Sequence, residues 1–391
     1  MRHLLLCTLL LLWAGHISAQ LSAPDQPGPY TTARLDTTFS DSFYSTGNIP
    51  GLSFYPVRPV GDTTRFPVVV LGHGFQMQHT DYNRILQHLA SWGYITFSPD
   101  VQNGFNTNHG TYARQLAACI RWIQAEGARS GSRFHNRVAA TSATCGHSMG
   151  GGAAQVAPFH YSSITAISGL APANTTTSTP NNFSALAGFT NLPAMFIGVQ
   201  GDRVTTLAQH VNPQYDSLRT RKQKTISLIG GHCSFADAPD LLCNFGATTS
   251  GEPAANGQQP MLDAVQNLSK RYLTAFYEVE LKGNTAYRLF LCGDSALADT
   301  RVSITQDQMC PTASGVNPAL QSQPELRVLG QDRYYVGGAR PLYATDLLGR
   351  RLPVQVERWN EGHSVTLPAG QTEQLLWLVT DRGVLRLPVV R

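Results

Sequence analysis

Short apolar runs alternate with amphipathic segments along most of the chain, and this alternation limits the fold more than any other feature of the sequence. The run 66–71 is continuously apolar and ends at a glycine, which is typical of a strand buried on both faces. Apolar residues at helical spacing follow at 81–92. Further strands are expected at 94–97, 137–144, 164–167, 194–199 and 224–229, and further helices at 112–126, 205–211, 215–218 and 261–277. This order predicts an α/β protein with a mostly parallel sheet and helices on both faces.

The amino-terminal residues 1–19 are predicted to be a processing signal rather than part of a fold. A short cationic start is followed by an apolar run from Leu4 to Trp13 and by small residues before Gln20, which is the pattern of a secretory signal peptide cleaved after Ala19. The alternative is a membrane anchor, but the run is shorter than the roughly 20 residues that span a bilayer. No later segment is long and apolar enough to span one. We therefore predict a secreted, extracellular protein without a transmembrane segment.

Three further segments follow from the distribution of residue types. Residues 20–298 contain the alternating strands and helices and form the predicted main domain. Residues 299–325 are rich in Gln, Ser, Thr, Asp and Pro, which predicts a linker. Beyond it, residues 326–391 show short strand-like runs separated by turns. The sequence thus predicts an α/β domain followed by a small all-β domain.

The charge content argues against one broad class of function. Charged residues make up 14% of the chain of 391 residues, against about 25% in ordinary soluble domains. The net charge of +4 is small for this length and no basic run occurs, so nucleic-acid binding is not expected. Neutral polar residues in place of charged ones suit an extracellular protein.

The cysteines of the mature chain predict disulfide bonds. Six cysteines remain once Cys7 leaves with the signal peptide, and an even number in an exported protein favours disulfides. The alternative is that some of these residues are buried free thiols. A structural zinc site is not expected, because no paired C-x-x-C occurs. Proximity along the chain favours the pairs Cys119–Cys145, Cys233–Cys243 and Cys292–Cys310.

The strongest chemical signal is the run Gly146-His147-Ser148-Met149-Gly150. It is a G-x-S-x-G motif that follows a predicted strand and precedes a helix start rich in Gly and Ala. On a sharp strand-to-helix turn the Ser148 hydroxyl would project above the sheet edge as a nucleophile. The two glycines would allow the close backbone contacts of such a turn. An ordinary glycine turn is the alternative, but the flanking strand and helix favour the nucleophile.

A serine hydroxyl is a weak nucleophile without a base, and in folds with this motif the acid and then the histidine follow the serine. Asp202 follows the predicted strand 194–199, and His232 follows the predicted strand 224–229. The carboxyl ends of neighbouring parallel strands are where such sites assemble. We predict Ser148 as the nucleophile, His232 as the general base and Asp202 as the acid that orients it.

Other acidic and imidazole side chains fit these roles less well. Asp237 and Asp240 follow His232 and therefore fail the order expected of the acid. His210 lies within a predicted helix rather than at a strand end. His73, in the loop after the first predicted strand, lacks further ligands at metal spacing. We expect no metal site, and no cofactor, because the nucleophile belongs to the chain.

Acyl transfer also requires hydrogen-bond donors for the oxyanion of its tetrahedral intermediate. The backbone N–H of Met149, directly after the serine, is one predicted donor. The loop Leu71-Gly72-His73-Gly74-Phe75 follows the first predicted strand and supplies the second. We choose the N–H of Phe75 for this role.

Taken together, these residues resemble the cutinase and polyester hydrolase group of α/β-hydrolases, which includes enzymes that cleave polyethylene terephthalate. The chain is also similar to the related dienelactone hydrolase, chlorophyllase and lipase branches. The resemblance covers residues 51–296 and rests on three matches: the serine motif 146–152, the acid loop and helix 202–218, and Gly231-His232. It implies an α/β-hydrolase fold and an ester substrate, and it gives Ser148, Asp202 and His232 the same roles. We expect the protein to be a monomer.

The resemblance also implies a set of substrate-binding residues. Phe75 falls where the group has an aromatic oxyanion residue, and Phe75, Met149, Ala173 and Val204 would line the ester pocket. One position departs from the group, because Ala173 stands where these polyester hydrolases carry a Trp that stacks on the substrate ring. The stretch 174–183, rich in Thr and Asn, would reshape the same wall. This departure weakens the expectation of a polyester substrate.

The carboxyl-terminal segment has a resemblance of its own. The run 342–350, which ends in Asp346-Leu347-Leu348-Gly349-Arg350, and the later Leu367-Pro368-Ala369-Gly370 are similar to the sorting domains of type IX secretion. This resemblance implies the secretion machinery as a partner. The alternative is a small β accessory or binding domain.

The sequence leaves three kinds of function open. The first is a secreted serine hydrolase of carboxylic esters, acting on polyester-like substrates or, like chlorophyllases and lipases, on small or lipid esters. The second is a non-catalytic secreted binding protein on the same fold. The third is a serine peptidase, which nothing in the sequence favours. The chain lacks a large lid insertion, so we expect short acyl chains to react better than long ones.

Overall fold

The computed structural model describes residues 21–41, 47–175, 178–239, 241–255, 257–310, 325–329, 333–337, 341–345, 351–359, 362–367, 376–380 and 383–387. The predicted signal peptide, residues 1–19, lies outside the described residues. Within them, no helix combines the length and the apolar character needed to cross a membrane.

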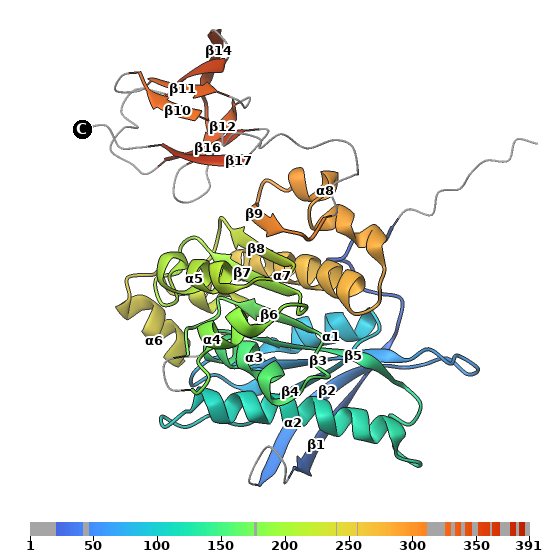
Figure 1. The fold of residues 1–391 in the computed structure, drawn as a ribbon. Helices are drawn as coiled ribbons and strands as arrows, with labels where there is room; N and C mark the ends of the chain where they lie inside the picture. The colour runs from blue at the N-terminus through green and yellow to red at the C-terminus, as the bar shows by residue number, and fades with distance from the viewer. Residues whose placement is uncertain are drawn as a thin grey trace, which may run out of the picture.

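A nine-stranded mixed β-sheet forms the centre of the larger part of the molecule (Figure 1). Its order is β1-β2-β4-β3-β5-β6-β7-β8-β9. The neighbouring strands in the central run β4-β3-β5-β6-β7-β8 pair in parallel. The pairs β1–β2, β2–β4 and β8–β9 are antiparallel. The chain is therefore an α/β protein with a mostly parallel sheet, as the alternation predicts. The strands are β1 (Thr32–Ser40), β2 (Asn48–Pro56), β3 (Phe66–Gly72), β4 (Ile95–Pro99), β5 (Val138–Gly146), β6 (Ala166–Leu170), β7 (Ala194–Val199), β8 (Lys222–Ser227) and β9 (Val302–Asp307).

Helices cover both faces of this sheet (Figure 1). The longer ones are α1 (Asn83–Ser91), α2 (His109–Ala128), α3 (Met149–His160), α6 (Leu241–Thr249) and α7 (Gln259–Glu280). The shorter ones are α4 (Asn182–Gly188), α5 (Asn212–Ser217) and α8 (Asp294–Leu297), with helical turns η1 (His79–Tyr82), η2 (Leu207–Val211), η3 (His232–Phe235) and η4 (Thr285–Phe290). Helices α4 and α6 were not expected from the sequence.

Burial on both faces explains the continuous apolar run of β3, all of whose residues are buried. Val69 and Leu71 belong to the core layer that also contains residues of α1 and α7. Val68 and Val70 belong to the opposite layer, which contains residues of α2 and α3. Each such side chain stabilises the fold by about 1.5–3 kcal/mol when it is fully buried. The site described below lies at the carboxyl ends of the strands that these two layers hold in place.

Residues 302–307 differ from the sequence-based expectation. This segment, inside the predicted linker 299–325, forms β9 and pairs with β8 along its whole length. Val302 and Ile304 pack against the core layer beside α7, while Ser303 and Thr305, which alternate with them, are exposed. A half-buried edge strand carries polar residues on its open face. These polar residues give the segment the composition of a linker.

Two of the three predicted disulfides are present. Cys233–Cys243 joins η3 to α6, with the Cα atoms 5.9 Å apart. Cys292–Cys310 joins the end of η4 to the chain after β9, with the Cα atoms 6.3 Å apart. The two bonds therefore anchor helix α6 and the chain that follows β9, the last strand of the sheet.

The third predicted pair, Cys119–Cys145, is wrong, because both cysteines are buried and free. Cys119 belongs to the core layer on the α2 side of the sheet, whereas Cys145 belongs to the layer on the α7 side. The sheet thus separates the two thiols. Burial raises the pKa of both.

The carboxyl-terminal part contains only β-strands within its described residues, in agreement with the predicted small all-β domain. Its strands form two four-stranded antiparallel sheets of order β10-β11-β15-β14 and β13-β12-β16-β17. Residues 346–350 and 368–370, which contribute to the resemblance to sorting domains, lie outside the described residues. The strands are β10 (Glu325–Val328), β11 (Arg333–Gly337), β12 (Pro341–Thr345), β13 (Arg351–Leu352), β14 (Gln355–Trp359), β15 (Gly362–Thr366), β16 (Leu376–Thr380) and β17 (Gly383–Leu387).

Candidate active site

Ser148 occupies the sharp turn between β5 and α3. Its backbone has φ 52° and ψ −118°, in the region of positive φ that residues other than glycine rarely adopt. The Ser148 N–H donates to the Leu170 carbonyl at 3.0 Å, and the Ser148 carbonyl accepts from the Ala173 N–H at 2.8 Å. These bonds, to the end of β6 and to the loop after it, hold the turn in a conformation that costs about 1–3 kcal/mol and that is common at functional sites.

The two glycines of the motif are required by close backbone contacts. A Cβ atom on Gly146 would lie 2.2 Å from the carbonyl carbon of Gly150. A Cβ atom on Gly150 would lie 2.2 Å from the carbonyl oxygen of Gly72, at the end of β3. Any side chain at these positions would push α3 away from the two strands. The G-x-S-x-G spacing is thus explained by the packing of a helix start against β3 and β5.

His232 and Asp202 approach Ser148 from the carboxyl ends of β8 and β7. His232 Nε2 lies 3.0 Å from Ser148 Oγ, and His232 Nδ1 lies 2.9 Å from Asp202 Oδ2. All three residues are buried. The structure therefore brings together the three residues that the chain order singles out. In this arrangement a hydroxyl proton can pass to an imidazole whose other nitrogen faces a carboxylate.

Asp202 has hydrogen-bond partners on both oxygens. Oδ1 accepts from the N–H groups of Val204 and Thr205 at 2.9 and 2.7 Å, and Oδ2 accepts from the Thr205 hydroxyl at 2.7 Å. Burial alone would raise the pKa of Asp202, but the charge of His232 and these hydrogen bonds outweigh burial and hold that pKa below its ordinary value. A carboxylate that faces Nδ1 of His232 keeps the proton on Nδ1, which leaves Nε2 free to accept one.

His147, the residue before the serine, connects His232 to the loop after β3. It is fully buried. Its Nε2 lies 3.0 Å from the His232 carbonyl oxygen, so Nε2 carries the proton and donates. Nδ1 then accepts from the Tyr82 hydroxyl at 2.8 Å, and that hydroxyl accepts from the Gly74 N–H at 3.2 Å. Burial lowers the pKa of His147 to about 3, so the ring is neutral near pH 7.

The two predicted oxyanion donors lie on segments that touch each other. Phe75 is in the turn after β3, Met149 is the first residue of α3, and the close contact of Gly72 with Gly150 joins the segments. Neither the Phe75 N–H nor the Met149 N–H has an acceptor among the described residues. For Met149 this follows from its place, because the first N–H groups of a helix lack intrahelical acceptors. Met149 is buried, whereas Phe75 is 46% exposed, with its ring against that of Phe105.

Ala173 and Val204, the remaining residues expected to line the pocket, are half-buried. The Ala173 N–H donates to the Ser148 carbonyl at 2.8 Å, and the Val204 N–H donates to Asp202 Oδ1 at 2.9 Å. Both positions are therefore fixed relative to the serine and the aspartate.

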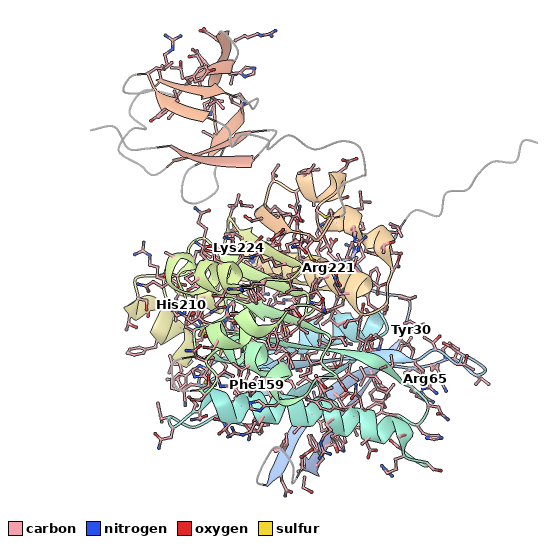
Figure 2. The ribbon with its side chains drawn as sticks, in the orientation of Figure 1. Tyr30, Arg65, Phe159, His210, Arg221 and Lys224 are labelled. Atoms are coloured by element: carbon pink, nitrogen blue, oxygen red, sulfur yellow. A yellow bond between two sulfur atoms is a disulfide. The ribbon has the colours of Figure 1, made fainter. Side chains whose placement is uncertain are left out.

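The other imidazole and acidic residues considered from the sequence make different contacts. His210 lies on η2 (Figure 2), and its Nδ1 accepts a backbone N–H from the loop after β6 at 3.0 Å. His73 is buried, with both ring nitrogens against backbone carbonyl oxygens. Asp237 accepts a backbone N–H of α1, and Asp240 lies outside the described residues. Within the described part of the chain, no group of three or more His, Cys, Asp or Glu side chains is arranged to hold a metal ion.

Two polar residues beside His232 were missed by sequence reasoning, as was the connecting role of His147. The Thr205 hydroxyl lies 3.1 Å from His232 Nδ1. Glu252 Oε2 accepts from the His232 N–H at 2.8 Å. Thr205 lies within three residues of Asp202, a spacing that could have drawn attention to it. Glu252 lies 20 residues beyond His232, and no local pattern identifies it.

The fold and the site define an α/β protein with a buried, hydrogen-bonded serine, histidine and aspartate at its strand ends. Residues 17–247, more than half of the chain, match the family described as "PETase: PET hydrolase-like", and the chain belongs to this family. It is also similar to bis(hydroxyethyl) terephthalate hydrolase of Streptomyces coelicolor, with 29% identity over 191 residues. That match covers 49% of this chain and 56% of the relative, so it spans about half the length of each protein.

Proposed function

We propose that this chain is a secreted serine hydrolase of carboxylic esters with an α/β-hydrolase fold. The observation that carries the proposal is the hydrogen-bonded series from Ser148 Oγ through His232 to Asp202, with distances of 3.0 and 2.9 Å. The positive φ of Ser148 at a strand-to-helix turn and the chain order of the three residues support the fold assignment. Membership of the PET hydrolase-like family supports the type of reaction.

In the proposed reaction Ser148 Oγ attacks the ester carbonyl carbon while its proton passes to His232 Nε2. The tetrahedral intermediate then collapses, the bond to the alcohol oxygen breaks, and the alcohol leaves with the proton from Nε2. Water attacks the resulting acyl-enzyme and gives a proton to Nε2. That proton returns to Ser148 Oγ as the carboxylic acid is released. Asp202 stabilises the imidazolium of both steps.

The N–H groups of Phe75 and Met149 are the proposed oxyanion donors. Both N–H groups are without an acceptor within the described residues, and donors left unpaired by the protein are available to a developing negative charge. Loss of one such donor typically raises the barrier by about 3–4 kcal/mol. The proposal therefore places the carbonyl oxygen of the substrate between the turn after β3 and the start of α3.

Esters of aromatic carboxylic acids are the proposed substrate class. The relative named as a bis(hydroxyethyl) terephthalate hydrolase supports this class. The contacting rings of Phe75 and Phe105, 46% and 79% exposed, offer aromatic surface next to one proposed donor. Ala173, which stands where the resemblance places a stacking Trp, supplies no ring of its own to the loop after β6. A panel of bis(hydroxyethyl) terephthalate, short and long p-nitrophenyl acyl esters, triglycerides and polyethylene terephthalate film tests the class, and a preference for long acyl chains would contradict it.

Replacement of the nucleophile tests the reaction itself. Wild type and S148A are compared on bis(hydroxyethyl) terephthalate and p-nitrophenyl butyrate, and both are treated with a fluorescent serine-directed phosphonate. We expect turnover and labelling in the wild type and neither in S148A, with equal melting temperatures. Turnover by S148A would contradict the proposed nucleophile. Absence of labelling and turnover in the folded wild type would favour the non-catalytic binding protein.

Export is the remaining part of the proposal, with cleavage after Ala19 and the carboxyl-terminal β region as the sorting element. The two disulfides support an oxidising compartment. Mass spectrometry of protein recovered from the culture medium should find an amino terminus at Gln20. Recovery of chains that retain residues 1–19 would contradict the cleavage.

A further inference from the structure

Glu252 is a buried carboxylate in the segment that follows α6. It is 5% exposed, and its backbone N–H donates to the Ala247 carbonyl at 2.9 Å, which closes the end of the helix. The segment is anchored at both ends: Cys243 of α6 is bonded to Cys233, and the Ala255 N–H donates to Asn244 Oδ1 at 2.8 Å. The position of Glu252 is therefore fixed by a disulfide bond and by hydrogen bonds on either side of it.

The two oxygens of Glu252 bind two different loops. Oε1 accepts from the N–H of Arg203 at 2.5 Å, and Oε2 accepts from the N–H of His232 at 2.8 Å. Arg203 directly follows Asp202, so one carboxylate connects the loop that carries the aspartate with the loop that carries the histidine. Gly231 makes the approach possible, because a Cβ atom there would lie 2.3 Å from Glu252 Oε2.

The main chain of His232 is consequently held on both sides. Glu252 accepts its N–H, and His147 donates to its carbonyl oxygen at 3.0 Å. Burial raises the pKa of Glu252, and the N–H donors of Arg203 and His232 oppose that rise. Charge-assisted hydrogen bonds to buried N–H groups are among the stronger ones in proteins, and a removed acceptor leaves the donor unpaired.

We propose that Glu252 is a positioning residue of the proposed ester hydrolysis. It sets the separation of the loops after β7 and β8, and through them the 2.9 Å contact of Asp202 Oδ2 with His232 Nδ1 and the 3.0 Å contact of His232 Nε2 with Ser148 Oγ. Glu252 acts through the two backbones and does not touch the substrate. This inference rests on the proposed function, and the test below separates the two.

The alternative is that Glu252 only stabilises helix α6. The two roles differ in what they change: a stabilising residue alters the melting temperature, whereas a positioning residue alters kcat at an unchanged KM. A displacement of about 1 Å in a reacting group can cost about 10²-fold in rate. Gln keeps the size of Glu but offers one acceptor oxygen instead of two. The loss of kcat should therefore be smaller in E252Q than in E252A.

Kinetics of E252Q and E252A on bis(hydroxyethyl) terephthalate, measured on the fraction that is folded by circular dichroism, test the proposal. We expect kcat to fall about tenfold in E252Q and about 10²-fold in E252A, with KM within about twofold of wild type. E252Q is nearly isosteric and decides the test if E252A does not fold. A kcat of E252Q within about twofold of wild type would overturn the proposal.

The matched control is E280Q. Glu280 is also a poorly exposed carboxylate with a charged partner, Arg221 (Figure 2), at 2.8 Å. It lies at the end of α7, and its partner directly precedes the start of β8 rather than following its carboxyl end. E280Q should lower the melting temperature and keep kcat, and an equal loss of kcat in E280Q and E252Q would also overturn the positioning role. S148A is run in the same series. Turnover by S148A would refute the proposed function, whereas an inactive S148A with a fully active E252Q would refute only the role of Glu252.

Discussion

Substitution of Asp202 by Asn tests the tautomer on which the proposed mechanism depends. The N–H groups of Val204 and Thr205 point at Oδ1 from 2.9 and 2.7 Å, so in D202N the amide oxygen must take that position. The amide NH2 then takes the position of Oδ2, 2.9 Å from His232 Nδ1. Because an NH2 group only donates, Nδ1 becomes the acceptor and the ring proton moves to Nε2, where it faces Ser148 Oγ.

A histidine in that tautomer cannot accept the serine proton. The expected loss in kcat is about 10⁴-fold, which corresponds to about 5 kcal/mol of activation free energy. The opposite orientation of the amide does not rescue the reaction, because it leaves two backbone N–H groups facing a donor, at a cost of about 1–3 kcal/mol for each. Because the two N–H donors at Oδ1 fix the orientation of the amide, replacement of one oxygen by NH2 should nearly abolish turnover.

The assay is kcat on p-nitrophenyl butyrate for wild type, D202N and D237N, with melting temperatures to establish that each variant is folded. Asp237 is a matched control, because it is a half-buried aspartate that also accepts a backbone N–H, here from Arg84 at 2.9 Å. D237N should retain kcat within about threefold. A folded D202N with kcat within about tenfold of wild type would refute the argument from the orientation of the amide.

Gly150→Ala should destabilise the protein by about 3 kcal/mol or more, because the added Cβ atom would lie 2.2 Å from the Gly72 carbonyl oxygen. Urea unfolding measures this loss. A urea midpoint equal to that of the wild type would contradict the prediction and show that α3 can move away from β3. Replacement of both Cys233 and Cys243 by Ser should lower the free energy of unfolding by about 3 kcal/mol. It should also lower kcat, because this bond anchors η3. Replacement of both Cys292 and Cys310 should lower the free energy of unfolding by a similar amount and leave kcat unchanged. Equal kcat values in the two double variants would contradict this difference. The free energy of unfolding should fall as the pH drops from about 6.5 towards 3. Burial lowers the pKa of His147 to about 3 in the folded protein, so in this pH interval the unfolded chain binds a proton at His147 and the folded chain does not. In His147→Asn the free energy of unfolding should depend less steeply on pH, and an unchanged slope would be inconsistent with a neutral, buried His147.

Local patterns in the sequence were sufficient for the parallel sheet and for the residues that meet at its strand ends. The apolar run of β3 and the motif around Ser148 depend on neighbours within a few residues, and the structure forms both as expected. Cys119 and Cys145 show the limit of this reasoning, because proximity along the chain does not say on which face of a sheet a thiol lies. The hydrogen bonds from Arg203 and His232 to Glu252 could not be predicted from the sequence either, since they join three segments that come together only in the folded chain.

Strand β9 restricts where the chain can be shortened. A cut at residue 299, the boundary that composition suggests, would remove β9 from β8 and leave Cys292 without its partner. The N–H and C=O groups of β8 would then form an open edge, onto which a strand of another molecule could add and begin aggregation. A protease that releases the carboxyl-terminal β region and leaves the rest of the protein in solution must therefore cut beyond Cys310.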